Sequence, residues 1–124
     1  MEKSCEVLFD TNFLTLPQKF KIDIIKETQR LVPNAKLITL EQVPPELKKL
    51  KQGAIGQQMI ERGTIKVVPW ESQGDADKAI LEYALKHKTI VATNDKALKE
   101  QLRNLKVPVI YLRGRKKLEL RGNI

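Results

Sequence analysis

The sequence predicts a three-layer α/β/α protein, with a central parallel sheet of strand order 3-2-1-4-5 between two layers of helices. Two observations predict the layers and the parallel sheet, and 3-2-1-4-5 is the strand order expected for such a sheet. Five short apolar segments alternate along the chain with segments of helical periodicity, an order that is typical of parallel sheets. The apolar segments are continuous rather than interrupted by polar residues, as expected for strands that are covered on both faces.

The first two strands and the helix between them are expected within residues 6–40. Glu6–Phe9 is predicted as a strand because its last three residues form an unbroken apolar run. Pro17 favours the start of a helix, and apolar residues at helical spacing continue this helix to Leu31. Lys36–Leu40, after a break at Pro33, is the second predicted strand.

A second helical region is expected to begin at Pro44 and to end near Gly63. Gly53 and Gly56 lower the helix propensity in its middle, so this region is expected to form one helix or two. Residues 65–68, which are short and β-branched, form the third predicted strand.

The clearest helix is predicted over residues 76–87, where apolar residues recur at i, i+3, i+4, i+7, i+8 and i+11. Residues 89–92 form the fourth predicted strand, and a helix through Leu105 follows it. Residues 107–112 form the fifth strand. Residues 118–120 are expected to pair back on this strand as an antiparallel extension.

The positive charge of the chain is concentrated in its last third. Residues 1–85 contain 12 Lys/Arg and 12 Asp/Glu, whereas residues 86–124 contain 11 and 3, so the formal net charge of +8 arises there. A localised basic surface is typical of proteins that bind a polyanion, although a solvated surface without a partner is the alternative. The densest basic segment, residues 113–124, is expected to bind phosphates through Arg113, Arg115, Lys116 and Lys117.

The composition disfavours several other classes of protein. No apolar run is long enough to cross a bilayer and no secretory signal is visible, so a cytoplasmic protein without a membrane partner is expected. Cys5 is the only cysteine, which excludes an internal disulfide and a cysteine-rich zinc site. With His87 as the only histidine, a nucleophilic triad has little support. Residues 1–124 are expected to form one domain.

Two acidic residues come directly after strands that are expected to be neighbours. Asp10 follows the first strand and Asp95 the fourth, and the switch in strand order lies between them. Asp77 and Glu46 lie in the first turns of two helices near the same edge of the sheet. Neighbouring carboxylates repel one another unless a cation intervenes, and Mg²⁺ or Mn²⁺ accepts such oxygen ligands. A pair of these ions could support hydrolysis of a phosphodiester.

Each acid also has a purely structural interpretation. Asp10 and Asp95 can cap helices or form turns, and Asp77 and Glu46 can stabilise helix dipoles. Asp75 is a better candidate than Asp77 for the N-cap of its helix. It is the conjunction of four acids at one edge that favours a metal site.

Three motifs resemble those of the PIN-domain family of metal-dependent nucleases: VLFDTN at residues 7–12, GDADKAI at residues 74–80 and IVATND at residues 90–95. They occur in the family's order and on the family's elements, and the resemblance covers nearly the whole chain. Residues 107–120 resemble the archaeal relatives of ribosomal-RNA-processing PIN endonucleases, whereas toxin-type PIN proteins usually lack such a basic extension.

The resemblance implies a PIN-like fold and a role for several residues. Lys78 stands where close relatives often carry a second acid. It is expected either to lower metal occupancy, which would favour a protein that does not cut, or to contact a phosphate. Four acids match the catalytic, metal-binding positions for Mg²⁺ or Mn²⁺, and two polar residues match positions that orient them by hydrogen bonding. The acids are Asp10, Glu46, Asp77 and Asp95, and the orienting residues are Asn12 and Thr93.

A divalent-metal-dependent endoribonuclease is therefore the expected activity, with RNA, and ribosomal precursor RNA in particular, as the expected partner. A homodimer is compatible with the resemblance. Two alternatives stay open: a PIN-like protein that binds RNA or assists ribosome assembly without cutting, and a toxin-type PIN ribonuclease.

Overall fold

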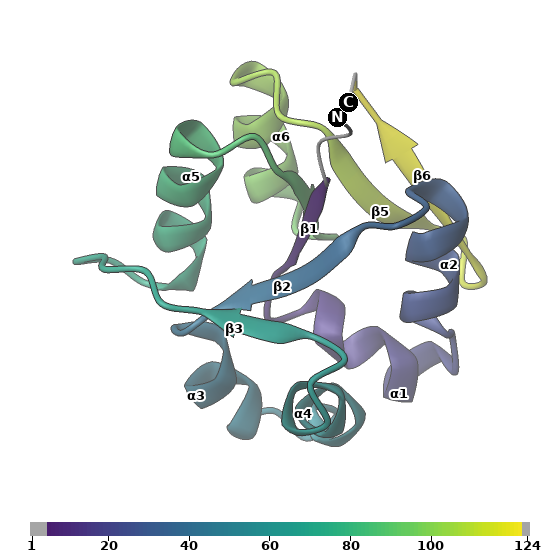
Figure 1. Cartoon of the computed structure of the whole chain (residues 1–124). Coiled ribbons are helices and arrows are strands. Elements are labelled where there is room, and N and C mark those ends of the chain that lie inside the picture. The colour runs from purple at the N-terminus through teal and green to yellow at the C-terminus, as the bar shows by residue number, and fades with distance from the viewer. Residues whose placement is uncertain (1–4, 123–124) are drawn as a thin grey trace.

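The computed structural model describes residues 5–122. Six strands form one sheet of order β3-β2-β1-β4-β5-β6 (Figure 1). Strands β1 to β5 run parallel, and β6 pairs antiparallel with β5, which confirms the predicted order and the predicted extension. The strands are β1 (Glu6–Phe9), β2 (Lys36–Leu40), β3 (Lys66–Val68), β4 (Ile90–Ala92), β5 (Val109–Arg113) and β6 (Lys117–Arg121).

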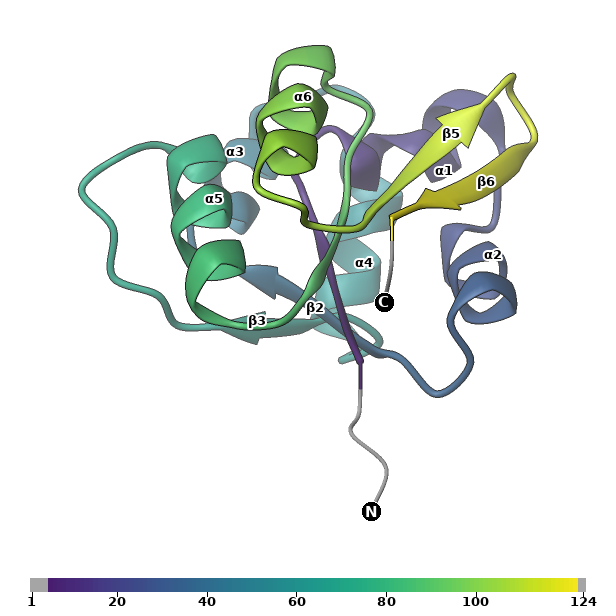
Figure 2. The same ribbon diagram turned by 90° about the horizontal axis from the view of Figure 1, so that it is seen from above.

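Helices cover the sheet on both faces, as expected for a three-layer fold (Figure 2). A hydrophobic core lies on each face of the sheet, and the side chains of β1 alternate between the two. Val7 and Phe9 pack on the side of α1 to α4, and Leu8 packs on the side of α5 and α6. The helical elements are η1 (Phe13–Thr15), α1 (Leu16–Phe20), α2 (Ile24–Leu31), α3 (Val43–Lys48), α4 (Ala54–Glu61), α5 (Ala76–Lys86) and α6 (Lys96–Asn104).

The single helix predicted over residues 17–31 is wrong, because the chain breaks between α1 and α2. Lys21 adopts a left-handed conformation with φ 54°, which ends α1. Asp23 then caps α2 by accepting a hydrogen bond from the Lys26 N–H at 3.0 Å. Apolar spacing runs across this break because Ile22 is buried although it is not helical.

The second helical region consists of two helices, and its two glycines allow close contacts. A Cβ at Gly56 of α4 would lie 2.6 Å from the Leu14 carbonyl oxygen in η1. A Cβ at Gly53 would lie 2.5 Å from the Leu47 carbonyl oxygen in α3. The absence of a side chain at Gly56 therefore allows α4 to pack closely against η1, which follows Asp10 in the chain.

Three strands begin later than predicted, by one residue in β3 and β4 and by two in β5. Pro108 has no N–H to donate and Lys106 is left-handed with φ 61°, so the regular part of β5 begins after both residues. Within residues 5–122, no helix is both long enough and apolar enough to cross a membrane.

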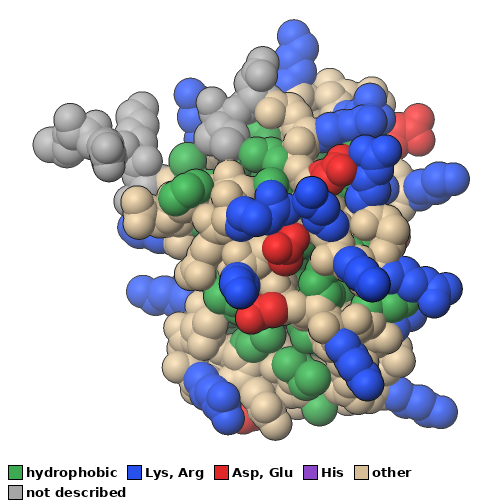
Figure 3. Space-filling model, turned by 90° about the vertical axis from the view of Figure 1, so that its right-hand side faces the viewer, with side chains coloured by type: hydrophobic (Ala, Val, Ile, Leu, Met, Phe, Trp, Pro, Cys, Tyr) green, Lys and Arg blue, Asp and Glu red, His purple; other side chains and the backbone are tan. Residues whose placement is uncertain are grey.

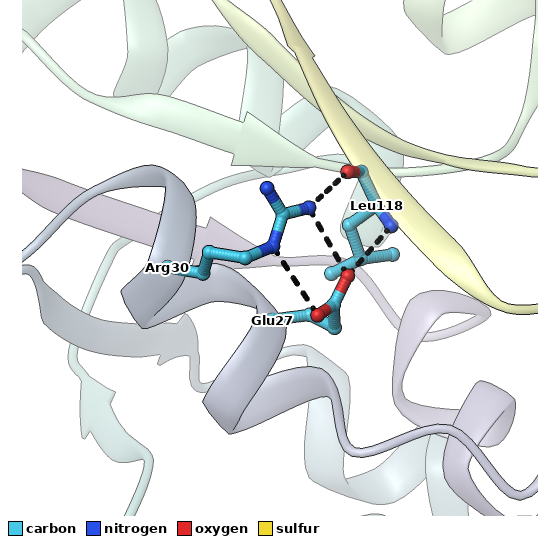
Figure 4. A network of polar contacts seen from close by, with 3 residues as sticks. All are labelled: Glu27, Arg30 and Leu118. Carbon is cyan, nitrogen blue, oxygen red and sulfur yellow. Dashed lines mark hydrogen bonds and ion pairs between the residues drawn. The ribbon is translucent and has the colours of Figure 1, made fainter.

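The C-terminal strand is attached to α2 by a polar contact with its backbone (Figure 4). The Leu118 N–H donates to Glu27 Oε1 at 3.2 Å, and the Leu118 carbonyl oxygen accepts from the Arg30 guanidinium at 3.0 Å. Arg30 also forms an ion pair with Glu27 at 3.2 Å. These contacts satisfy backbone groups on the outer edge of the sheet, where β6 has no further strand to pair with.

Candidate metal centre

Asp10 lies at the carboxyl end of β1, where the strand gives way to η1. It is 2% exposed, and both of its carboxylate oxygens accept hydrogen bonds. The Phe13 N–H donates to Oδ1 at 2.7 Å, and the Thr93 hydroxyl donates to Oδ2. These contacts fix the orientation of the carboxylate, and each oxygen keeps a lone pair for a further ligand.

Thr93 connects the two acids that follow neighbouring strands. It is fully buried directly after β4, and its hydroxyl accepts a hydrogen bond from the Asp95 N–H at 3.1 Å while it donates to Asp10. Asp95 caps α6, because its Oδ1 accepts from the Leu98 N–H at 2.9 Å. The structural interpretation of Asp95 therefore holds, and its carboxylate is also near enough to Asp10 for the two charges to repel.

A pocket of about 270 Å³ opens beside Asp10. Glu46 reaches it from the first turn of α3, and Asp77 from the first turn of α5. The Thr11 hydroxyl donates to Glu46 Oε1 at 3.0 Å and so orients this carboxylate. Three of the four predicted acids thus share one pocket, whose lining consists of Asp10, Thr11, Asn12, Glu46, Lys49, Leu50 and Asp77.

The acids influence one another electrostatically. The pKa of Asp10 is raised to about 7, chiefly by burial, with smaller contributions from the charges of Asp77 and Asp95. The hydrogen bonds from Thr93 and Phe13 act in the opposite direction. Partial burial raises the pKa of Asp77 as well, with repulsion from Asp95 as the next cause. Asp95 is not part of the pocket lining, but its charge acts on both of these residues. The four acids form one electrostatic cluster.

The donor set suits a hard divalent cation, because it consists of carboxylates whose repulsion a cation would relieve. Within residues 5–122, no three Asp, Glu, His or Cys side chains are close enough to surround an ion by themselves. Water and substrate oxygens would have to complete the coordination, as they commonly do around Mg²⁺. The chemistry of the site therefore fits Mg²⁺ or Mn²⁺ in an open site.

Two polar residues of the pocket, Thr11 and Lys49, were not predicted from the sequence. Thr11 is buried against Glu46, and the only signal for it was its place between Asp10 and Asn12. Lys49, at the end of α3, adds a cation to the pocket lining. Asn12 lies in the lining, but in the described part of the chain its side chain makes no hydrogen bond to an acid. Its orienting role stays a prediction.

The helix after the pocket begins as expected from its sequence. Asp75 caps α5 by accepting a hydrogen bond from the Lys78 N–H at 3.0 Å, which leaves Asp77 uninvolved in the cap. Lys78 is exposed, and its aliphatic stem packs on Gly74: a Cβ at Gly74 would lie 2.3 Å from Lys78 Cδ. Its predicted contact with a phosphate stays a prediction.

The basic C-terminal residues surround the turn between β5 and β6. Because β5 is parallel to β1 and β4, this turn lies at the carboxyl ends of the parallel strands, as Asp10 and Asp95 do. Arg113 is engaged in an ion pair with Glu119 at 3.1 Å, and the Arg115 guanidinium lies 5.9 Å from the centre of the Phe20 ring. Figure 3 shows that Lys and Arg outnumber acidic side chains on the face that carries α2 and β6.

Comparison with known proteins identifies the family. The profile of the family described as "PIN like domain" matches residues 7–115. The chain belongs to the PIN-domain family. This PIN domain is also similar to two archaeal proteins along most of their length.

Ribonuclease VapC4 of Methanocaldococcus jannaschii is 32% identical to this PIN domain over 130 residues, covering 96% of this chain and 98% of the relative. Ribonuclease VapC9 of Archaeoglobus fulgidus is 30% identical over 119 residues, covering 92% and 87%. The solved structure of the PIN domain endonuclease Utp24 matches with a TM-score of 0.83 and 25% identity, covering 96% of this chain and 92% of that chain. These relatives support the endoribonuclease class that the sequence predicted.

Proposed function

We propose that this PIN domain is a divalent-metal-dependent endoribonuclease that hydrolyses phosphodiester bonds at the pocket beside Asp10. One observation carries the proposal: a buried carboxylate, held by two hydrogen bonds, faces other acids whose charges oppose its own ionisation. Such an arrangement is unfavourable without a cation, and perturbed acids in a pocket are typical of functional sites.

Asp10 and Asp95 would hold Mg²⁺ or Mn²⁺ from the sheet edge, and Asp77 and Glu46 from the helices around the pocket. When bound, the cation would supply Lewis acidity and charge neutralisation at the phosphodiester. Thr93 and Thr11 keep the carboxylates of Asp10 and Glu46 oriented.

In the hydrolysis, a water oxygen loses a proton and forms a bond to phosphorus. The ester bond to the leaving oxygen breaks, and this oxygen gains a proton. Lys49 is placed to contact a phosphate oxygen beside this centre, because it shares the pocket with Asp10. The carboxylates orient the reacting groups, and Lys49 adds a fixed positive charge.

The finer function that we propose is processing of ribosomal precursor RNA in the cytoplasm, by a monomer or a homodimer. Its support is the resemblance of residues 107–120 to ribosomal-RNA-processing PIN endonucleases. The basic segment at the β5–β6 turn, which lies at the same end of the strands as the acids, also favours RNA. Arg113, Arg115, Lys116, Lys117 and Lys78 would contact the RNA backbone, which gives affinity without reading sequence.

Cleavage by purified protein tests the proposal. A labelled RNA is incubated with Mn²⁺ and with the wild type, Asp10→Asn or Asp95→Asn. We expect both variants to lose at least about a hundredfold in rate. The matched control is Asp23→Asn, which changes an exposed helix cap in α2 and is expected to retain the wild-type rate. Equal cleavage by Asp10→Asn and the wild type would contradict the assigned site. RNA binding without cleavage by the wild type would favour the non-catalytic alternative.

A toxin-type PIN ribonuclease is the second candidate, and the VapC names of both sequence relatives favour it. The alignment covers 96% of this chain and 98% of VapC4, so the two proteins match along almost their whole length. Induced expression in a bacterial host tests this candidate. Growth arrest by the wild type, with normal growth under Asp10→Asn, would support the toxin over the processing enzyme.

A further inference from the structure

A second concave surface shares none of its lining residues with the acidic pocket. It has a volume of about 740 Å³, within the range of ligand-binding pockets, and it lies between α6 and the β5–β6 hairpin. We refer to it as the α6–hairpin groove. Its lining consists of Lys96, Lys99, Glu100, Arg103, Asn104, Tyr111 and Arg121.

The groove arises because the sheet extends beyond one of its helix layers. In β5, Ile110 packs in the core under α1 to α4, and Val109 packs in the core under α6. Tyr111, two residues after Val109, is on the same face as Val109 but is only partly buried. Figure 2 shows that the hairpin extends to the side of α6. The flank of α6 and the uncovered face of the hairpin therefore form the two walls.

The charge of this groove is strongly positive: four of its seven lining residues are Lys or Arg, and one is acidic. Lys96, Lys99 and Arg103 recur along α6 at about one helical turn, so they lie in a row roughly 5 Å apart. The ion pairs of residues 5–122 are Arg30–Glu27 and Arg113–Glu119, and neither involves a cation of the groove.

Tyr111 holds two of the cations close together. Lys99 Nζ lies 5.1 Å from the centre of its ring and the Arg121 guanidinium carbon lies 5.9 Å from it. The Tyr111 hydroxyl donates to Glu119 Oε1 at 3.0 Å, which fixes the ring. Two positive charges held around one ring favour an anion between or beside them, because an anion relieves their repulsion.

We propose that the α6–hairpin groove binds the sugar–phosphate backbone of a single-stranded part of the RNA substrate. This inference rests on the proposed nuclease function. Lys96 directly follows Asp95, so the row of cations begins next to the acidic cluster and leads away from it along α6. A row of cations beside an aromatic residue is typical of surfaces that bind single-stranded nucleic acid. RNA that leaves the cleavage site would have its phosphates contacted in turn by Lys96, Lys99 and Arg103.

Binding of a fluorescent 12-nucleotide single-stranded RNA tests the groove. Affinity is measured in EDTA, so that no cleavage occurs, over a series of salt concentrations. We expect Lys96→Gln/Arg103→Gln to bind at least about fivefold more weakly than the wild type. The slope of log K against log[salt] is expected to become shallower by about 1.4, because each lost phosphate contact removes about 0.7 for a single strand.

The matched control is Arg62→Gln/Lys66→Gln, which removes two exposed cations at β3, on the opposite edge of the sheet. It has the same net charge as the groove variant, and we expect it to change the affinity by less than twofold. Equal affinities for the two double variants would overturn the proposal. Groove-dependent binding of polyglutamate in place of RNA would also overturn it, and would indicate an acidic protein partner.

These experiments distinguish failure of the groove proposal from failure of the nuclease proposal. If the two double variants bind RNA equally while the wild type cleaves RNA in Mn²⁺, the groove proposal is wrong and the nuclease proposal stands. If the groove variant alone loses RNA affinity and the wild type does not cleave, the groove stands as an RNA-binding site and the nuclease proposal fails.

Discussion

The Thr93 hydroxyl donates a hydrogen bond to the buried carboxylate of Asp10 and joins the ends of β4 and β1 at the candidate metal centre. The same hydroxyl accepts from the Asp95 N–H. One side chain thus orients one acid and fixes the backbone of the other. Contacts of this kind behind metal ligands commonly affect metal affinity by 10- to 100-fold.

Replacement of Thr93 by valine should weaken Mn²⁺ binding. The hydrogen bond from Thr93 lowers the pKa of Asp10, so its loss should raise that pKa and leave more of the acid protonated near pH 7. We expect calorimetry at pH 7 to show roughly tenfold weaker binding for Thr93→Val, with much of the loss recovered at pH 9, and near wild-type binding for Thr93→Ser.

Thr39→Val is the matched control for this experiment, because Thr39 is buried and its hydroxyl donates to the Phe9 carbonyl oxygen at 2.7 Å, away from the acids. Both valine variants lose a buried hydroxyl, and both should lose some stability. The account would be contradicted by equal Mn²⁺ affinities in the two variants.

The buried Asp10 should make the metal-free protein less stable as the pH rises. The folded state raises the pKa of Asp10 from 3.8 to about 7, so its contribution to stability is complete below pH 3.8 and is lost as the pH rises through about 7. Asp10→Asn removes this dependence. We expect urea denaturation in EDTA to show Asp10→Asn more stable than the wild type at pH 8, by up to about 4 kcal/mol.

The difference between these two proteins should shrink toward pH 4, where Asp10 is protonated in the folded state. Asp23→Asn serves as the comparison, because Asp23 is an exposed acid in a different part of the fold, and its replacement should not reproduce the stabilisation at pH 8. A wild type whose stability relative to Asp10→Asn stays constant from pH 5 to pH 8 would show that Asp10 is not buried as described.

The contact between α2 and β6 should contribute to stability at neutral pH. Glu27→Ala removes the acceptor for the Leu118 N–H and the partner of Arg30, and both contacts are partly exposed. We expect a loss of about 1 kcal/mol in the free energy of unfolding. The hydrogen bond from the Arg30 side chain lowers the pKa of Glu27, so this contribution is present above pH 4.5 and is lost as the pH falls below it.

Hydrogen exchange at the Leu118 amide reports this contact directly. It should accelerate in Glu27→Ala, whereas Glu61→Ala, which removes an exposed acid at the end of α4, should leave it unchanged. Equal exchange in the two variants would mean that Glu27 does not protect the strand.

Much of the site could be predicted from the sequence, because position along a parallel sheet determines which residues meet. Asp10 and Asp95 follow β1 and β4, which are neighbours in the sheet, so their proximity follows from the strand order alone. Local conformation was less predictable. The left-handed Lys21 breaks a helix whose apolar spacing continues, and no residue type at that position indicates the break.

Contacts between side chains from distant parts of the chain could not be predicted either. The ion pair of Arg113 with Glu119 could not be predicted, because it depends on the register of β5 and β6. Arg121 and Lys99 meet around the ring of Tyr111 only because α6 folds back beside the hairpin. The hydrogen bond from Thr11 to Glu46 could not be predicted, because nothing in the sequence places these two residues side by side.

Anomalous diffraction from crystals soaked in Mn²⁺ tests the central claim most directly, because it locates the ion without reference to activity. We predict a Mn²⁺ peak at the pocket, bound by Asp10 together with at least one of Asp95, Asp77 and Glu46, and absent in Asp10→Asn crystals soaked in the same way. A pocket without a peak in the wild type, or a peak at other acids such as Glu61, would contradict the account.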